Sequence, residues 1–167
     1  LSNNLLLGVI LPFALLQGLF FLYLTGLIMY VPFLYRMPSP LYLAMYPMAY
    51  LYVRTFIWDT KKLSKKDYLH FIPAFLHFLQ MIPFYLMPIE EKKAIVADVI
   101  RNGEKMIQFK EGGLPAYAQF GLIFIQGAIY CFFSYRIILK AKKKQHNTLF
   151  LSGEKWLYTF TSLMVLI

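Results

Sequence analysis

The chain has little charge, and the charge it has is confined to short strips. Charged residues make up 15% of the 167 residues, and none occurs before Arg36; a typical soluble domain has about 25%. Uncharged blocks also cover residues 37–53, 68–89, 114–135 and 156–167. About 20 apolar residues are enough to cross the hydrocarbon core of a bilayer. This pattern excludes an ordinary soluble domain and predicts an all-α fold, a polytopic bundle of transmembrane helices in one domain over residues 1–167.

Cysteine and intramembrane carboxylates are also scarce. Cys131 is the single cysteine, so no intramolecular disulfide can form. No aspartate or glutamate lies within the uncharged blocks, which argues against an ion-coupled transporter, a proton pump and a metalloprotease. No convergent set of acid, base and nucleophile is visible. We therefore expect neither an enzyme nor a bound cofactor or metal.

Apolar runs and proline positions predict five transmembrane helices. They cover residues 5–30, 40–58, 68–87, 114–139 and 155–167, and the last is truncated by the end of the sequence. Because the sequence begins at Leu1 instead of Met and stops inside an apolar run, we expect a fragment of a longer protein. Whether a further span precedes Leu1 is left open.

Lysine-rich strips set the expected orientation. The net charge of +9 lies largely beside apolar runs, where basic residues contact anionic headgroups, so nucleic acid is not the expected partner of these residues. Basic residues favour the cytoplasmic side of a membrane. This puts the lysine-rich strips at 61–66 and 140–144 inside and the charge-balanced loop 89–113 outside. We predict a multi-pass membrane protein that contacts lipids, with a homodimer as an open possibility. The topology anchors are Lys61, Lys62, Lys65, Lys66, Lys142, Lys143 and Lys144.

The loop 89–113 has a helical pattern of its own. Apolar residues recur in it at roughly helical spacing, and the turn signal Asn102-Gly103 divides it. We predict a short amphipathic helix that lies on the membrane or caps the bundle.

A row of polar and aromatic residues marks the second predicted span. Tyr42, Tyr46, Tyr50, Arg54 and Trp58 follow one another at intervals of four, which makes them neighbours on a helix surface. The row is a candidate ligand or signal face. The simpler interpretation is packing, with Arg54 reaching from about one turn inside the membrane to the inner headgroups.

Other polar features lie within the predicted spans. Pro47 leaves the carbonyl of Leu43 without its helical partner, and a nearby hydroxyl is a candidate donor. His70 and His77 are seven residues apart, about 10 Å along a helix, which is too far to share one metal ion. His77 lies near mid-span and joins the candidate signal face, with a structural interhelical hydrogen bond as the simpler interpretation. Interhelical hydrogen bonds are also expected for Gln17, Gln80, Gln119 and Gln126.

Three segments, in order, resemble a known family. They are the opening LLLGVILPFALLQGLFFLYLTGL, the stretch PSPLYLAMYPMAYLYVRTFI and, after the first lysine-rich strip, YLHFIPAFLHFL. Together they resemble the N-terminal membrane domain of Bacteroidetes transcriptional regulators of the AraC type. In that family a span ending in Tyr-x-Tyr-Val-Arg or Lys precedes a lysine-rich loop and a His-Phe-Ile-Pro opening. Here these motifs fall at Tyr50–Arg54, Lys61–Lys66 and His70–Pro73.

The resemblance implies a sensor in the bacterial inner membrane whose cytoplasmic C-terminal domain binds DNA through two helix-turn-helix motifs. This chain lacks that domain, so DNA is a partner only through a part of the protein outside it, and the signal ligand is unknown. Two alternatives stay open: the input domain of a membrane sensor kinase, and a small transporter subunit. A transporter should show internal repeats and broken polar helices near the midplane, and the sequence shows no repeat and few polar residues there.

Overall fold

The described structure, a computed structural model covering residues 1–60, 62–108, 112–143 and 148–165, is built from helices. Helix accounts for 85% of it, and no strand occurs in these ranges, so the predicted all-α class is confirmed. The α-helices are α1 (Ser2–Leu24), α2 (Ser39–Trp58), α3 (Ile72–Tyr85), α4 (Ile89–Arg101), α5 (Lys105–Gln108), α6 (Ala116–Lys143) and α7 (Thr148–Val165). The 3-10 segments are η1 (Leu27–Tyr30), η2 (Pro32–Leu34) and η3 (Lys65–Phe71).

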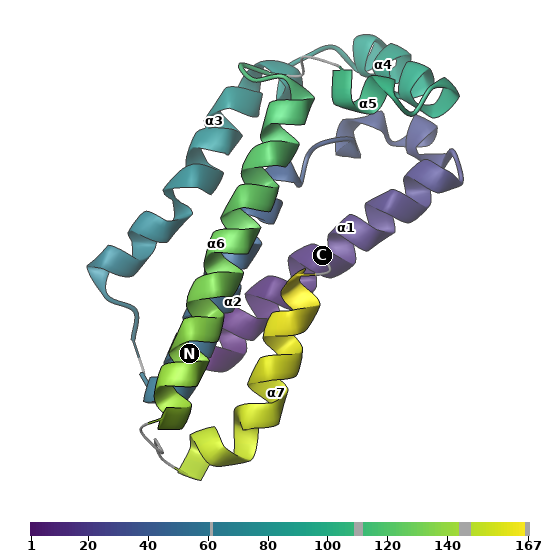
Figure 1. Ribbon diagram of the computed structural model, residues 1–167. Helices are drawn as coiled ribbons and strands as arrows, with labels where there is room; N and C mark the ends of the chain where they lie inside the picture. Colours follow the sequence, from purple (N-terminus) through teal and green to yellow (C-terminus); the bar gives the residue numbers. More distant parts are fainter. Residues whose placement is uncertain (61, 109–111, 144–147, 166–167) are drawn as a thin grey trace.

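The helix α2 forms the centre of the molecule. The helices α1, α3, α6 and α7 all pack against it, and most of its side chains are buried. Figure 1 shows α6 in front of α2, with α3 on the left and α1 and α7 on the right. Because α2 is apolar or aromatic around nearly its whole circumference, it can bury every face against a neighbouring helix.

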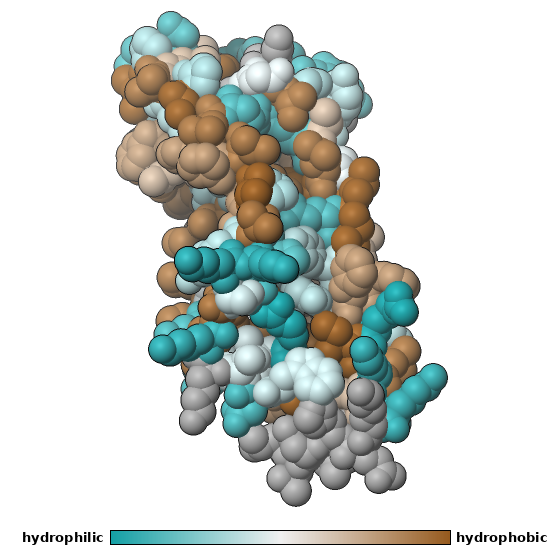
Figure 2. Space-filling model, turned by 90° about the vertical axis from the view of Figure 1, so that its left-hand side faces the viewer, coloured by the Kyte–Doolittle hydropathy of each residue, from teal (hydrophilic) through white to brown (hydrophobic). Residues whose placement is uncertain are grey.

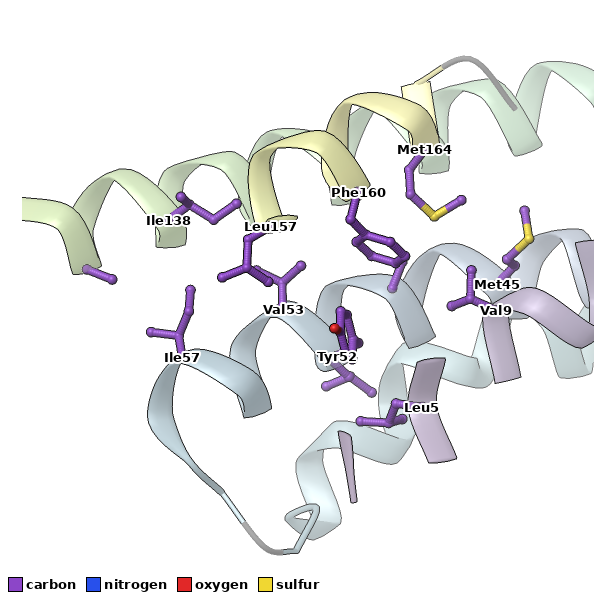
Figure 3. Close-up of a cluster of buried hydrophobic side chains, with 13 residues drawn as sticks. Leu5, Val9, Met45, Tyr52, Val53, Ile57, Ile138, Leu157, Phe160 and Met164 are labelled. Atoms are coloured by element: carbon purple, nitrogen blue, oxygen red, sulfur yellow. The ribbon is translucent and has the colours of Figure 1, made fainter. Parts of the chain in front are cut away.

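The main core joins α2 to α1, α6 and α7. Figure 3 shows Leu157 of α7 and Val53 of α2 pointing toward one another, with Ile138 of α6 nearby. Leu157 and Ile138 are 0% exposed, so this contact is closely packed. One polar bond crosses the same contact, because Trp156 Nε1 donates to the Tyr52 hydroxyl at 2.8 Å.

A second, smaller core lies under α4. Val96 and Val99 of α4 are fully buried against η1, the end of α3 and partly buried residues of α1. The Tyr23 hydroxyl of α1 donates to the backbone carbonyl of Val99 at 2.9 Å. The amphipathic helix predicted in the loop 89–113 is therefore present, and it ends at the Asn102-Gly103 turn and caps one end of the bundle.

The prediction of five transmembrane helices is wrong in number. By length and composition, two described helices are suited to cross a membrane, α1 and α6. A third candidate is the run Lys65–Tyr85 together with α4, which is bent by 106° at the break between them. The chain thus carries two candidate membrane-spanning helices, or three if the bent pair counts as one.

Each of the other predicted spans fails for a physical reason. The span 40–58 matches α2, but its tyrosines, prolines and Arg54 lower its mean hydropathy; such a helix suits a protein-lined interior better than lipid. The span 68–87 falls on η3 and α3 and counts as a candidate only together with α4, because the 14 residues of α3 itself reach only about 21 Å of the ~30 Å hydrocarbon core. The span 155–167 lies largely within α7, which begins earlier, at Thr148, and contains Glu154 and Lys155.

The first predicted span, 5–30, is also too long. The helix α1 continues through Pro12 but ends at Leu24, because Gly26 adopts a left-handed conformation with φ +72°. Glycine takes this conformation without a steric cost, and it commonly ends helices. Two short 3-10 segments then lead back to α2.

The two ends of the bundle differ in charge and structure. In Figure 1 the loop before α3 and the end of α6 lie at the lower end, whereas α4 and α5 lie at the upper end. The described lysines of both strips therefore share one end, opposite the capping helix. This is the arrangement that the predicted alternation of the loops requires.

Candidate ligand-binding groove

A groove runs between α3 and α6, with α2 as its floor. Its volume is about 790 Å³, within the ~300–1,000 Å³ range of ligand sites. It is lined by Leu43, Tyr50, His70, Pro73, Leu76, His77, Gln80, Leu114, Gln119, Leu122, Ile125, Gln126, Ile129, Tyr130 and Phe133. None of these side chains is an acid, a lysine or an arginine. The groove therefore suits an apolar or neutral group.

The floor of the groove contains the backbone defect created by Pro47. As predicted, this proline leaves the Leu43 carbonyl without its helical donor. The partner is an amide rather than the hydroxyl that we expected, because Gln126 Nε2 of α6 donates to the Leu43 oxygen at 2.8 Å. The other amide atom, Gln126 Oε1, is buried and has no hydrogen-bond partner. This bond ties α6 to the floor.

The upper end of the groove is closed by a chain of hydrogen bonds through His77. The backbone N–H of Leu114 donates to Gln80 Oε1 at 3.1 Å, so the amide nitrogen of Gln80 faces His77 Nδ1 at 2.9 Å. Nδ1 therefore accepts, and Nε2–H donates to Ser39 Oγ of α2 at 3.0 Å. The interhelical hydrogen bond predicted for His77 is present, and the imidazole is neutral in this arrangement.

An aromatic cluster forms the lower end of the groove. The hydroxyl of Tyr130 in α6 lies 2.9 Å from His70 Nδ1 in η3. The ring of Tyr50 packs on both, at centroid distances of 5.5 Å from His70 and 5.7 Å from Tyr130. Phe133 lies 6.5 Å from Tyr50. The cluster connects α2, η3 and α6 at one point, so η3 is fixed to both helices.

Arg54 forms an ion pair below this cluster. Its two terminal nitrogens donate to the two oxygens of Asp67 at 2.7 and 2.6 Å. Asp67 is buried, 4% exposed, and also accepts the backbone N–H of Ser64, which caps η3. The Arg54 guanidinium bonded to this carboxylate holds the pKa of Asp67 well below its usual range. Arg54 is thus a structural clamp between α2 and η3, where the sequence suggested an anchor in the headgroups.

The predicted row on α2 does not face a single cavity. Tyr50 and His77 line the groove, but Tyr42 lines a separate cavity of about 130 Å³ beside Arg36. Tyr46 is 5% exposed and packs on Gly127, where an added Cβ would lie 2.8 Å from the tyrosine ring. A step of four residues turns about 40° beyond a full helical turn, so the four steps from Tyr42 to Trp58 carry the row about 160° around the helix.

The lysines predicted as topology anchors are mostly exposed. Lys62, Lys65 and Lys66 extend from the segment before α3, and Lys143 ends α6. Lys142 forms an ion pair with Glu154 of α7 at 2.8 Å. Lys61 and Lys144 lie outside the described residues. Figure 2, which views the side of α3, shows extended hydrophilic side chains over the lower half and mainly apolar residues above.

The glutamines have different roles from one another. Gln126 forms the interhelical bond that we predicted, and Gln80 joins α3 to the start of α6. Gln119 instead donates to the Leu114 carbonyl at 2.8 Å, five residues earlier in the same chain segment. Gln17 is exposed on α1. The shared expectation was too simple because a glutamine in the first turn of a helix can bond locally.

Sequence reasoning missed the face of α6 that lines the groove. Its residues alternate in steps of three and four, the spacing that keeps side chains on one side of a helix. They are Gln119, Leu122, Gln126, Ile129 and Phe133, and the same spacing continues to Arg136, Lys140 and Lys143. This alternation was a readable signal. Asp67 was also missed, because no sequence pattern indicated that it would pair with Arg54.

Metal binding and known relatives add nothing to the assignment. Among the described residues, no group of three or more His, Cys, Asp or Glu side chains is placed to hold a metal ion. No protein-family model, no curated protein and no solved structure matches the chain. The groove and the sequence are therefore the observations that bear on function.

Proposed function

We propose that this chain is the signal-input domain of a membrane-bound transcription regulator of the AraC type, located in the bacterial inner membrane. The observation that carries the proposal is the groove between α3 and α6. It is large, uncharged and free of carboxylate, serine and cysteine side chains, which favours binding over catalysis. The DNA-binding output belongs to a part of the protein outside this chain.

The position of the groove supports a role in signal transmission. The two helices that form its walls both lead toward the lysine-rich end, α3 through η3 and α6 through its own last turns. A molecule between α3 and α6 that favours one separation of these helices shifts the population of the two arrangements. The molecule in the groove then shifts the conformational equilibrium of any output domain joined to the lysine-rich end.

Membrane insertion is the first part of the proposal. The helices α1 and α6 are long and apolar. Only 22% of an apolar 18-residue stretch of α1, and 17% of one in α6, is buried inside the protein. Large apolar side chains on them, such as Leu11 and Phe124 at 56% and 69% exposed, need lipid or protein around them. Loops on the lysine-rich side then face the cytoplasm.

Cysteine labelling tests this orientation. In a Cys131→Ser background, intact cells are treated with a membrane-impermeant maleimide after introduction of Arg101→Cys or Lys143→Cys. We expect labelling at position 101 and protection at position 143 until the cells are permeabilised. The reverse pattern would invert the topology, and equal labelling of both positions in intact cells would contradict the orientation proposed here.

The regulatory output has its own test. The native reading frame is followed beyond residue 167, and transcripts are compared between cells that carry or lack the gene. We expect two helix-turn-helix motifs and a confined set of transcripts that respond to the gene. A histidine-kinase core would support the alternative input domain, and a reading frame without any output domain would contradict the proposal.

A further inference from the structure

A second cavity continues the groove toward the lysine-rich end. It has a volume of about 550 Å³ and is lined by Tyr50 and Phe133, which also line the groove, by the apolar residues Ile137 and Leu139, and by Arg136, Lys140 and Lys143. The shared aromatic residues are the boundary between the two cavities. The surface therefore changes along α6 from apolar to strongly basic without leaving one side of the helix.

The second cavity has three basic residues on one face of α6. Arg136, Lys140 and Lys143 are at positions i, i+4 and i+7, so they project from the same face of α6. No acidic residue lines either cavity. The nearby carboxylates of Glu154 and Asp67 are bonded to other cations, Lys142 and Arg54. This cavity suits a group with negative charge.

The length of the apolar part indicates what such a group is attached to. From Gln119 to Phe133 the face of α6 extends about 21 Å at 1.5 Å per residue. One leaflet contributes about 15 Å, half of the ~30 Å hydrocarbon core. The groove is thus long enough for an extended acyl chain from one leaflet, and the basic cavity lies at the end where the headgroup would be.

We propose that this face of α6 binds one anionic phospholipid. The phosphate lies among Arg136, Lys140 and Lys143, and an acyl chain occupies the groove past Tyr50 and Phe133 toward Ile129. Basic clusters beside membrane helices attract anionic headgroups, and the absence of acidic side chains from both cavities supplies the charge complementarity. The inference rests on the membrane insertion proposed above, but it does not depend on transcriptional regulation.

The test is lipid retention by the purified 167-residue chain in a mild detergent, followed by native mass spectrometry. Dioleoyl phosphatidylglycerol is compared with dioleoyl phosphatidylcholine, which has the same chains but no net charge. We expect one tightly retained phosphatidylglycerol molecule. Removal of all three cations in the variant R136Q/K140Q/K143Q should weaken its binding about 100-fold, because each basic side chain near the headgroup contributes about fivefold.

Two further variants make the test specific. Lys142→Gln removes a cation from the same strip, but that cation is bonded to Glu154 and lies outside the cavity, so binding should be unchanged. Ile129→Trp fills the groove and should weaken the binding of both lipids. If the triple variant does not fold by circular dichroism, Lys140→Gln alone is used, with an expected loss of about fivefold.

Several outcomes would overturn the proposal. Equal loss with Lys142→Gln would show that general charge attraction explains the binding, and full retention by the triple variant would remove the basic cavity from it. Glycerol 1-phosphate has a phosphate but no acyl chain. If it displaced the lipid at an equal concentration, the acyl chain, and therefore the groove, would not contribute to binding. A photo-crosslink from position 129 to a second copy of the chain, in place of lipid, would assign the groove to a dimer. Failure of lipid binding with normal topology and transcript responses would leave the regulatory proposal standing.

Discussion

The two flanks of α2 are built in opposite ways. On one flank, α7 closes onto α2 and α6, and Leu157 is 0% exposed. Contact there is close enough that a Cβ added at Gly153 would lie 2.6 Å from the ring of Phe56. On the other flank, α3 and α6 both pack on α2 but leave a groove between them, where Leu76 and Leu122 are 57% and 49% exposed. The same central helix thus has one filled and one unfilled side.

The kind of side chain explains this difference. The filled flank is joined mainly by apolar residues that interdigitate at the density of a protein interior. In the groove, many of the polar groups are bonded to backbone atoms or to near neighbours, as Gln126 is to Leu43 and His77 is to Gln80. Bonds between the two walls occur at the ends of the groove, Gln80 with Leu114 and His70 with Tyr130, and the space between these ends stays open. Open volume is therefore compatible with a stable fold at this flank, and an apolar molecule can enter it without leaving buried charge.

The largest expected effect separates the two flanks directly. Leu157→Ala should lower the free energy of unfolding by about 2–5 kcal/mol, because it leaves a cavity in a closed core. Leu122→Ala makes the same chemical change in the groove wall and should cost less than about 1 kcal/mol, because that side chain is already half exposed. Denaturation of both variants in detergent by SDS titration checks this. Equal losses would mean that the groove is packed as tightly as the core.

The next effect concerns the clamp at the lower end of the groove. Arg54→Ala leaves Asp67 buried without its partner and should destabilise the chain by about 2–3 kcal/mol. Arg54→Lys should retain only part of this stability, since an ammonium cannot make the parallel two-bond contact of a guanidinium. The readout is the melting temperature in detergent. Lys93→Ala, which breaks an exposed pair with Glu90, is the control and should have almost no effect. If Arg54→Lys were as stable as the wild type, the parallel two-bond contact of the guanidinium with Asp67 would not be needed for stability.

A smaller effect is expected where α6 is tied to the floor. Gln126→Leu removes the donor to the Leu43 carbonyl, and the proline at position 47 prevents the helix from replacing it. We expect a loss of about 1 kcal/mol in detergent-based unfolding. Gln17→Leu, at an exposed position of α1, is the matched control and should be neutral. An increase in stability for Gln126→Leu would show that the unpaired Oε1 costs more than the Leu43 bond contributes.

The fold was partly predictable from the sequence. Long apolar runs located α2 and α6 within a few residues and α1 near its start, and the helical spacing of apolar residues in the loop 89–113 located the capping helix α4. The number of spans was not predictable from uncharged blocks alone, because α2 is a central helix most of whose side chains are buried by the neighbouring helices. An uncharged run indicates that water is absent around a helix. Surrounding protein and surrounding lipid both exclude water, so the run does not distinguish between them.

The candidate site was less predictable, for a different reason. Tyr50 and His77 were identified as candidates because polar residues within apolar runs stand out, and both line the groove. Their partners come from distant parts of the chain, as Asp67 does for Arg54 and Gln126 does for Leu43. Such pairs depend on how the helices cross, which periodicity within one helix does not determine. The four-residue row failed as a single face because of the rotation that accumulates along a helix.

The smallest expected effect is the pH dependence that the clamp introduces. The pKa of Asp67 is held well below its usual range by the Arg54 bonds, whereas in the unfolded chain it should return to about 3.9. The contribution to stability is therefore complete above about pH 5, and it falls as the pH drops through the unfolded-state pKa, since only the unfolded chain then takes up the proton. Between pH 5 and pH 3 the loss should be about 1 kcal/mol from this one group. Asp67→Asn should remove that part of the pH dependence, and Asp98→Asn, in the exposed pair with Lys105, should retain it. Unfolding at several pH values in detergent measures the slopes, and parallel curves for wild type and Asp67→Asn would show that the ion pair does not favour the ionised carboxylate.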